Sequence, residues 1–375
     1  MKGVGLLNIV FIITRGDDIG GAQIHVRDLA EALQDDGHQV TVLCGGSGAF
    51  TEMLDKHNIP YRVLKHLVHP INPYRDVLAY LEIGHILRVL KPDLVATHSS
   101  KAGILGRLAA HRLSIPVTFT AHGWAFTEGV NPQKRYVYRA IEQWAARLSR
   151  KIITVSEYDR ALALKERVGD AKQIVTIHNG IPDVPDRLRA RPEREPVRLI
   201  MVARFGHPKN HALLLDALAS LRTEPWSLDF VGDGPLLGEV RDRVRALGLE
   251  ERVVFLGRRD DVPELLASSN IFILTSRWEG FPLSIIEAMR AGLPVIASDV
   301  GGVKEAVVHG ETGFVVKGAD ADELAGYLQN LITSLEMRRK MGQAGRERYE
   351  KYFTFDHMFQ TTLKIYKELV GEKDS

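Results

Sequence analysis

Residues 271 to 289 read IFILTSRWEGFPLSIIEAM and have the pattern of a β-strand, a short loop and an α-helix. The apolar run IFILTS ends before a loop with Gly and Pro, and SIIEAM then continues with helical periodicity. Two carboxylates frame the turn, since Glu279 lies in the loop and Glu287 in the helix. The first turn of a helix has free backbone N–H groups, so this unit predicts an anion site at a strand's carboxyl end.

The same unit recurs along most of the chain. Short apolar runs predict strands near residues 8–14, 39–45, 61–67, 93–99, 116–123, 151–156, 173–180, 198–204, 226–232, 252–257, 271–276, 294–302 and 314–316. Helical patterns separate many of them, at 20–37, 77–92, 101–113, 136–148, 211–222, 236–248, 262–269, 284–292 and 321–332. This alternation is typical of parallel sheets covered by helices on both faces.

One segment interrupts the alternation and divides the chain. Residues 182 to 198, PDVPDRLRARPEREPVR, are rich in proline and charge, which is a linker composition. We therefore expect a domain at 1–182, a linker at 183–197, a second domain at 198–350, and a final helix at 351–375 that crosses back to the first domain. The predicted fold class is α/β, with two doubly wound, Rossmann-like domains facing each other across a cleft.

The composition excludes several classes of protein. The 375 residues include 49 Lys and Arg against 47 Asp and Glu, without the basic excess of a nucleic-acid-binding protein. The single cysteine, Cys44, ends an apolar run and excludes a disulfide framework; a buried core position suits it better than a nucleophile. The apolar N-terminal run is too short to span a bilayer, so we expect a cytoplasmic protein with possible contact at a membrane surface.

Candidate ligand-binding residues follow the predicted strands of the first domain. Gly20 and Gly21 precede a helix and would let a phosphate approach bare backbone, although a plain tight turn explains them equally well. His122 follows a strand and could donate a hydrogen bond or be a structural histidine. The segment THSSKAG would suit an anionic acceptor through His98, Ser99 and Lys101, unless its serines only cap the helix.

The second domain adds cations at corresponding positions. Arg204 ends a strand and Lys209 follows five residues later, a pair that suits a diphosphate, although most Arg and Lys are solvated surface charges. A carboxylate such as Glu287 accepts two hydrogen bonds from a ribose diol. Glu279 would face hydroxyl groups on the other side of the phosphates. Together these residues describe a site for a nucleotide sugar.

Two further patterns favour ordinary structure. Asp320 and Asp322 form a D-x-D pair, but they open a predicted helix, where Asp is stabilising without a metal. There is no H-E-x-x-H motif and no Cys/His cluster along the sequence, so we predict no metal site. The basic, aromatic helix around 131–151 could lie on an anionic membrane, or it could bury its aromatic side chains, the interpretation that we favour.

Taken together, these motifs resemble family 4 glycosyltransferases of the GT-B fold. The resemblance rests on EGFPLSIIE at 279–287, the Arg204 and Lys209 pair, GG at 20–21, HG at 122–123 and HNGI at 178–181, and it extends over essentially the whole chain. The segments THSSKAGILGRLAA and TAHGW resemble members that build exopolysaccharide or lipopolysaccharide.

The resemblance implies a role for each matching residue. Glu287 would bind the ribose, Glu279 the transferred sugar, and His122 would contact that sugar near its reacting carbon, with Arg204 and Lys209 neutralising the diphosphate. Backbone groups of Phe281, Leu283 and Ser284 would hold sugar and phosphate, while Pro282 departs from a common glycine and removes one N–H. The remaining expected donor contacts are Gly20, Gly21, Asn179, Gly232 and Arg258.

The implied reaction is a retaining, metal-independent transfer of a hexose, most simply from a UDP-sugar, to a lipid-linked or oligosaccharide acceptor. No cofactor is expected, since cations and a helix dipole would balance the leaving charge. The sequence leaves open a non-hydrolysing epimerase-like enzyme acting on a UDP-sugar and a non-catalytic two-lobed sugar-binding protein.

Overall fold

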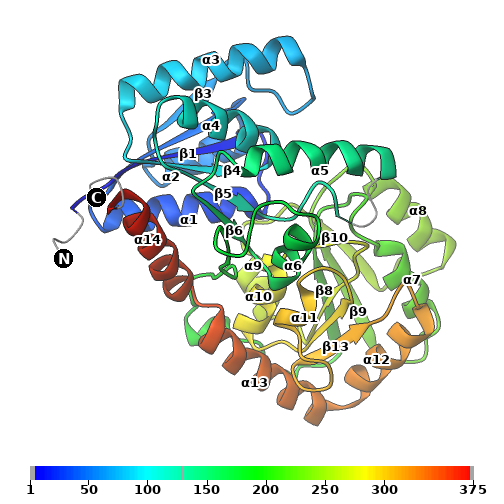
Figure 1. Ribbon diagram of the computed structural model, residues 1–375. Helices are drawn as coiled ribbons and strands as arrows, with labels where there is room; N and C mark the ends of the chain where they lie inside the picture. Colours follow the sequence, from blue (N-terminus) through cyan, green and yellow to red (C-terminus); the bar gives the residue numbers. More distant parts are fainter. Residues whose placement is uncertain (1–4, 128–130, 372–375) are drawn as a thin grey trace. The chain divides into compact units, whose positions relative to one another are not determined.

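A computed structural model describes residues 5–127 and 131–371 of the chain (Figure 1). The chain divides into two compact units. The first extends to His178 and resumes at Met358, and the second is Asn179–His357. The two units are described separately.

The first unit is built on a parallel sheet with the strand order β3-β2-β1-β4-β5-β6-β7 in the described residues. Its strands are β1 (Asn8–Arg15), β2 (Gln39–Gly45), β3 (Tyr61–Leu64), β4 (Leu94–His98), β5 (Val117–Ala121), β6 (Lys151–Thr154) and β7 (Ile174–Thr176). Its helices are α1 (Gly21–Asp35), α2 (Ala49–Lys56), α3 (Pro73–Leu90), α4 (Ser100–Arg112), α5 (Pro132–Ala146) and α6 (Glu157–Lys165). Helices α3 and α4 cover one face of the sheet and α1 the other (Figure 1).

The second unit repeats the plan with a sheet of order β10-β9-β8-β11-β12-β13. Its strands are β8 (Val197–Val202), β9 (Trp226–Val231), β10 (Val253–Gly257), β11 (Ile271–Leu274), β12 (Val295–Ser298) and β13 (Gly313–Val316). Its helices are α7 (His211–Ala219), α8 (Leu237–Ala246), α9 (Val262–Ala267), α10 (Leu283–Ala291), α11 (Val303–Ala306), α12 (Ala321–Thr333) and α13 (Leu335–Tyr352), preceded by a 3₁₀ turn, Asp186–Leu188.

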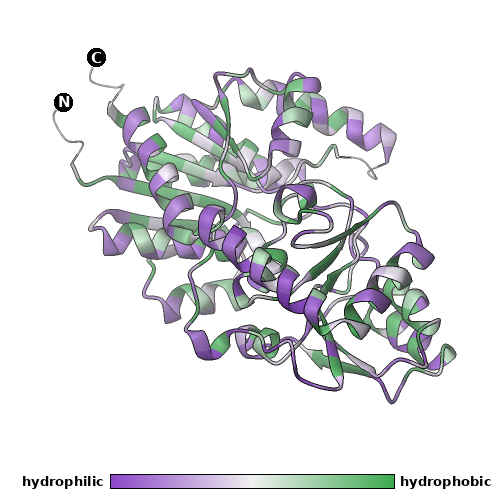
Figure 2. Ribbon diagram, turned by 90° about the horizontal axis from the view of Figure 1, so that it is seen from below, coloured by the Kyte–Doolittle hydropathy of each residue, from purple (hydrophilic) through white to green (hydrophobic). Residues whose placement is uncertain are grey.

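Both sheets form where apolar, β-branched runs can be buried on two faces. Every residue from Ile9 to Ile13 in β1, and every residue of β11, is buried. Figure 2 shows the strands as hydrophobic ribbons among helices of mixed character, as expected when helices shield both faces of a parallel sheet. Both sheets follow the order 3-2-1-4-5-6 of doubly wound folds, with β7 added at the end of the first, and this confirms the predicted α/β class.

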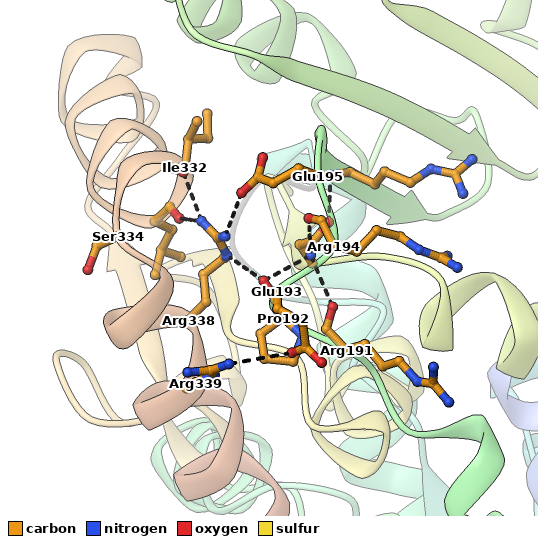
Figure 3. A network of polar contacts seen from close by, with 12 residues as sticks. Arg191, Pro192, Glu193, Arg194, Glu195, Ile332, Ser334, Arg338 and Arg339 are labelled. Carbon is orange, nitrogen blue, oxygen red and sulfur yellow. Dashed lines mark hydrogen bonds and ion pairs between the residues drawn. The ribbon is translucent and has the colours of Figure 1, made fainter.

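The segment predicted as a linker lies in the second unit, where it is fastened by buried polar side chains (Figure 3). The Arg338 guanidinium, 1% exposed, donates to the carbonyl oxygens of Pro192, Leu331 and Ile332 and pairs with Glu195. Asn270 donates its amide to the carbonyl oxygens of Arg191, Pro192 and Arg194. The charges in this segment therefore serve local attachment to the second unit.

The last helix, α14 (Phe355–Gly371), begins in the second unit and continues in the first, from Met358. Its buried residues include Phe359, Leu363 and Tyr366. The sequence predicts a final helix at 351–375, and residues 372–375 of that segment lie outside the described residues. No helix in the described part of the chain combines the length and apolarity that crossing a bilayer requires.

The structure departs from the sequence prediction in two ways. Helices α2 and α6, of 8 and 9 residues, were not predicted because neither carries a long apolar stripe. On α5, the preference for buried aromatic side chains is wrong for Tyr136 and Trp144, which are exposed, whereas Tyr138 packs against the core. The outward apolar side chains of α5 thus remain to be explained.

Candidate functional site

Several of the predicted site residues follow the strands at the topological switch points of the two sheets. In the first unit the order reverses between β1 and β4, and in the second between β8 and β11. Ligands of open α/β sheets bind outside the carboxyl ends of the strands at such points. The glycines 20 and 21 follow β1, Ser99 follows β4, Arg204 follows β8, and Glu279 follows β11.

The centre of the second unit's site is a bonded group of three side chains. The Lys209 ammonium donates to the Glu279 carboxylate in a short ion pair, and the Ser276 hydroxyl donates to the same carboxylate oxygen at 2.5 Å. Both charged side chains are largely buried, Lys209 at 17% and Glu279 at 12% exposure. The sequence placed Lys209 at the phosphates and Glu279 at the sugar, but it did not predict that the two would pair or that Ser276 would join them.

Backbone hydrogen bonds hold the two loops of this group together. The N–H of Asn210 donates to Thr275 at 2.9 Å, and the N–H of Arg277 donates to Pro208 at 2.7 Å. A third loop supports Glu279, because Gly301 has φ +55° and a Cβ there would stand 1.9 Å from the Glu279 carbonyl oxygen. Only glycine permits that approach, so the carboxylate is fixed by its backbone as well as by its partners.

Helix α10 presents its N-terminus beside this group. Pro282 is the N-cap, and among the described residues no side chain caps the helix. The N–H groups of Leu283 and Ser284 belong to the first turn, where an anion is favoured. Asn179 is 4% exposed and donates to the Phe281 carbonyl oxygen at 3.0 Å, so it positions the loop before α10. Glu287 lies half-buried on α10.

Three other predicted residues line the same edge of the second sheet. Arg204 is exposed directly after β8, and Arg258 is exposed directly after β10. Gly232 has φ +140°, and a Cβ there would meet the Ala203 carbonyl oxygen at 2.1 Å, so this glycine is required for packing next to Arg204. The cations therefore flank a rigid backbone at the strands' carboxyl ends.

In the first unit, the polar residues after β4 are engaged by neighbouring elements. The Ser99 hydroxyl bonds with the Thr14 hydroxyl at 2.7 Å and accepts from the Thr14 N–H at 3.1 Å, and it does not cap α4. Thr14 itself accepts from the Ala102 N–H at 3.1 Å. Lys101 pairs with Asp76 at 2.7 Å, so its charge is balanced by α3. Gly20 is the N-cap of α1, and Gly21 is exposed at its first position.

Three histidines converge where β4, β5 and α1 meet. His98 Nδ1 lies 3.0 Å from His122 Nε2, and the two rings stack with centroids 5.3 Å apart. His25 approaches His122 edge-on at 4.9 Å. One nitrogen atom from each ring lies within 4.8 Å of the others, a set that could hold a metal ion. The sequence did not predict His25 here, although its place four residues after Gly21 on α1 was a usable signal.

Burial keeps the two bonded rings neutral. Desolvation, followed by the proximity of His122 and His25, holds the pKa of His98 well below its ordinary value of 6.5. Desolvation and then His25 lower the pKa of His122 in the same way. At neutral pH each of the two rings is therefore uncharged and has a single N–H.

His122 also lines a cavity of about 670 Å³ in the first unit. The walls combine apolar side chains with polar and charged ones in similar number. The lining residues include Ile71, Asp76, Lys101, Tyr138, Ile141 and Glu142. His98 is fully buried behind His122, so its side chain reaches a ligand through His122.

Two other candidates have structural roles. Burial raises the pKa of the Cys44 thiol to about 12, which agrees with a core position and not with a nucleophile. Asp320 caps α12 by accepting from the N–H groups of Asp322 and Glu323, each at 3.0 Å. The D-x-D pair is therefore a helix start.

Comparisons with known proteins show which family the chain belongs to. Residues 19–183 match the model of Glycosyltransferase Family 4, and residues 186–348 match that of Glycosyl transferases group 1. A relative from Escherichia coli, UDP-Gal:alpha-D-GlcNAc-diphosphoundecaprenol alpha-1,3-galactosyltransferase, is 30% identical over 360 residues, 92% of each chain. The N-acetyl-alpha-D-glucosaminyl L-malate synthase of Bacillus anthracis is 28% identical, over 96% of this chain and 97% of its own.

A solved structure shares the fold. Anabaena HepE, in complex with UDP and glucose, superimposes with a TM-score of 0.83 at 23% identity, covering 96% of this chain and 99% of its own. The chain belongs to the family 4 glycosyltransferases of the GT-B fold and is a glycosyltransferase. This confirms the resemblance seen in the sequence.

Proposed function

We propose that the protein is a retaining, metal-independent hexosyltransferase that uses a UDP-sugar and a lipid-linked or oligosaccharide acceptor in bacterial exopolysaccharide or lipopolysaccharide synthesis. The observation that carries the proposal is the bonded group of Lys209, Ser276 and Glu279 beside the uncapped start of α10. It combines a cation, a helix N-terminus and a fixed carboxylate, which are the elements that a sugar diphosphate requires.

The choice of UDP rests on similarity. The Escherichia coli relative is named for UDP-Gal, and HepE was solved with UDP and glucose. In our proposal Glu287 binds the ribose hydroxyls, the N–H groups of Leu283 and Ser284 bind phosphate oxygens, and Glu279 orients the hydroxyls of the sugar. Arg204 and Lys209 balance the diphosphate, a task for which other transferases use a metal ion.

The proposed reaction balances without a protein base. The bond between the sugar's anomeric carbon and the phosphate oxygen breaks, and the acceptor oxygen forms its bond to that carbon on the same face. The acceptor hydroxyl's proton passes to the departing phosphate oxygen, so the anomeric configuration is retained. Protein groups stabilise the negative charge that grows on the diphosphate.

In our proposal the first unit meets a lipid-linked acceptor at a membrane surface. Exposed apolar side chains lie just before α3, along α3 and along α5, namely Ile71, Tyr74, Val77, Leu81, Tyr136, Val137, Ile141 and Trp144. Exposed cations accompany them, among them Arg75, Lys134 and Arg147. Apolar stripes with basic neighbours suit an anionic bilayer, so we propose peripheral binding to the cytoplasmic face of the inner membrane.

The test is a donor screen with purified protein. A panel of UDP- and GDP-sugars is incubated with and without EDTA, and nucleotide release and the linkage of any product sugar are measured. We expect release from one UDP-hexose, unchanged by EDTA, and an α-linked product from an α-linked donor. Loss of activity in EDTA would contradict a metal-independent reaction. A product with inverted anomeric configuration would contradict a retaining mechanism. Free UDP together with an epimerised sugar would indicate the epimerase-like reaction.

A further inference from the structure

The first unit contains a second cavity, at the edge of its sheet where strands begin. The cavity has a volume of about 1100 Å³, and its lining includes Val117, Arg150 and Gln173, at or directly before the first residues of β5, β6 and β7. These strands are parallel, so their amino ends share one edge of the sheet. Ser99 and His122 follow the carboxyl ends of β4 and β5, at the opposite edge. The second cavity is therefore separate from the candidate site.

The charged side chains of this cavity are mainly cationic. Four Lys and Arg side chains line it, namely Arg147, Arg150, Arg167 and Lys172. All four are exposed, and within the described part of the chain their side chains form no ion pair and no hydrogen bond. Asp170 is the one carboxylate among the described lining residues, and it accepts from the N–H groups of Lys172 and Gln173 at 2.8 and 2.9 Å. Four positive charges against one negative leave an excess of three.

The ends of neighbouring helices explain only part of this charge. Helices α4, α5 and α6 end near the cavity, at Arg112, Ala146 and Lys165. Each helix C-terminus has about half a negative charge, which a cation complements. Three such ends amount to about one and a half charges, and with Asp170 they still do not balance the four cations. The remaining positive charge is available to an anionic ligand.

A buried hydroxyl of the same cavity lacks a partner. Ser149 is 7% exposed and lines the cavity, and its Oγ has no hydrogen-bond partner in the described residues. A buried polar group without a partner is costly, and such groups are rare in folded proteins. Phosphate oxygens accept hydrogen bonds from hydroxyl groups, so a phosphate bound at Arg147 and Arg150 would satisfy Ser149 between them in the chain.

The backbone that carries these residues is fixed without a ligand. The Gln173 amide donates to the carbonyl oxygens of Ala146 and Ser149, each at 2.7 Å. The N–H of Arg150 donates to the Val117 carbonyl oxygen at 2.9 Å. The turn between α5 and β6 is thus held to the starts of β5 and β7. A site that is already ordered binds its ligand without the entropic cost of ordering a loop.

We infer that this cavity binds the phosphate groups of an anionic ligand through its four cations and the Ser149 hydroxyl. Arginine guanidinium groups suit phosphate because they offer paired N–H donors. Soluble phosphate esters and phospholipid headgroups both carry such groups, and the exposed Trp144 lies about one helical turn before Arg147. The inference does not depend on the proposed transferase reaction.

The first test is calorimetric titration of the whole protein with inorganic pyrophosphate, in the presence of UDP to occupy the proposed donor site. We expect binding that Arg150→Gln weakens by about tenfold, the effect of losing one charged hydrogen-bond donor. Arg112→Gln is the matched control, because Arg112 is exposed at the end of α4 and does not line the cavity. It should change the affinity by less than about twofold, through screened charge alone.

The comparison of these two variants assigns the pyrophosphate site whether or not UDP binds, so this test and the proposed function fail independently. Equal pyrophosphate affinities for Arg150→Gln and Arg112→Gln would overturn the inference.

Ser149→Ala separates ligand binding from a structural role. Because the variant removes a buried hydroxyl that has no partner, the free energy of unfolding of the free protein should stay the same or rise. The affinity for pyrophosphate should instead fall by about tenfold. Urea unfolding and the same titration measure the two effects. A less stable variant with unchanged affinity would overturn the assignment of Ser149 as a donor to the ligand.

Vesicles distinguish the two sources of phosphate. Sedimentation compares binding to phosphatidylcholine vesicles with and without phosphatidylglycerol. If the natural ligand is a headgroup, Arg150→Gln should lower binding to the anionic vesicles more than Arg112→Gln does, and pyrophosphate should displace the wild type from them. If it is a soluble phosphate ester, the two variants should bind vesicles equally while they differ in the titration.

Discussion

At the scale of single residues, most of the candidate site consists of polar side chains that follow the ends of strands. Lys209, Glu279 and His122 could each be named from the sequence, because each follows a predicted strand. Their partners could not, because Ser276 and His25 become relevant only when the backbone brings loops and helices together. A single sequence shows which side chains are near an edge but not which of them bond to one another.

The pairing of Glu279 with Lys209 and Ser276 predicts its role in the reaction. Glu279→Gln keeps an oxygen that can accept from Ser276 but removes the charge. If Glu279 only orients the sugar, kcat should fall by about 10- to 100-fold, because one charged hydrogen bond is weakened. Steady-state kinetics with the donor found in the screen measure this.

The control for Glu279 is an exposed glutamate on α8, Glu239→Gln, which should leave kcat unchanged. A loss of 10⁴-fold or more in Glu279→Gln, with a covalent sugar adduct on the wild type, would mean that Glu279 is a nucleophile. Residual turnover in the variant with retention of configuration would exclude that role.

The burial of His211 in the second unit predicts that the free energy of unfolding decreases in acid. Burial, followed by the charge of Lys209, lowers the pKa of His211 to about 4, below its ordinary value of 6.5. Between pH 6.5 and pH 4 the unfolded chain therefore binds a proton at His211 that the folded chain does not bind. The contribution of the neutral ring to the free energy of unfolding is fully present above pH 6.5 and decreases as the pH falls. From pH 7.5 to 5.0 the loss from this residue is about 2 kcal/mol.

His211→Phe should remove that part of the pH dependence, because the ring stacks on Phe205 at 4.3 Å and a phenyl ring can take its place. Urea unfolding at the two pH values gives the comparison. The exposed His207→Gln serves as the control and should keep the wild-type difference. An unchanged pH dependence in His211→Phe would show that the buried ring is not the sensor.

At the scale of elements, periodicity predicted the strands well and the irregular segments poorly. The apolar runs predicted as strands form β1 and β11, because a short, continuous apolar run is typical of a strand that is buried on both faces. Helix α6 was missed, although Ser156 accepts from the Asp159 N–H and is a normal start signal. Composition alone could not show that 183–197 is held against α13, because the partners are carbonyl groups and a distant arginine.

The attachment of that segment can be tested with neighbouring arginines (Figure 3). Arg338→Ala leaves buried carbonyl oxygens of Pro192, Leu331 and Ile332 without their donor, and we expect it to lower the free energy of unfolding by about 3 kcal/mol. Arg339 is the matched control, because its side chain is 60% exposed and its guanidinium lies 4.0 Å from the Glu193 carboxylate. Arg339→Ala should change the free energy of unfolding by less than about 0.5 kcal/mol. Equal effects in urea unfolding would show that the segment is not held by Arg338.

At the scale of the whole molecule, the chain repeats one strand order twice and assigns different ligand chemistry to each copy. The second unit carries the cations and the helix start suited to a diphosphate, and the first carries the histidines and a cavity with both apolar and polar walls. The positions of the cations and of His122 after strands could be expected from the sequence, because ligand sites of such sheets lie at the carboxyl ends of the strands, whereas the place of His25 could not. What the sequence did not indicate is the direction of the apolar side chains on α5, since a helical stripe reads the same whether it faces a core or a bilayer.

The exposed stripe of α5 makes a prediction about how the intact protein meets a membrane. Trp144 is 46% exposed, and indole rings favour the interface between lipid and water. In sedimentation with vesicles containing an anionic phospholipid, Trp144→Ser should lower the partition coefficient by about tenfold, equal to roughly 1.4 kcal/mol of lost apolar burial. Tyr352→Ala, which removes an aromatic ring of similar exposure in the second unit, should leave binding unchanged. Equal binding of Trp144→Ser and the wild type, or binding that does not depend on the anionic lipid, would exclude α5 as the membrane contact.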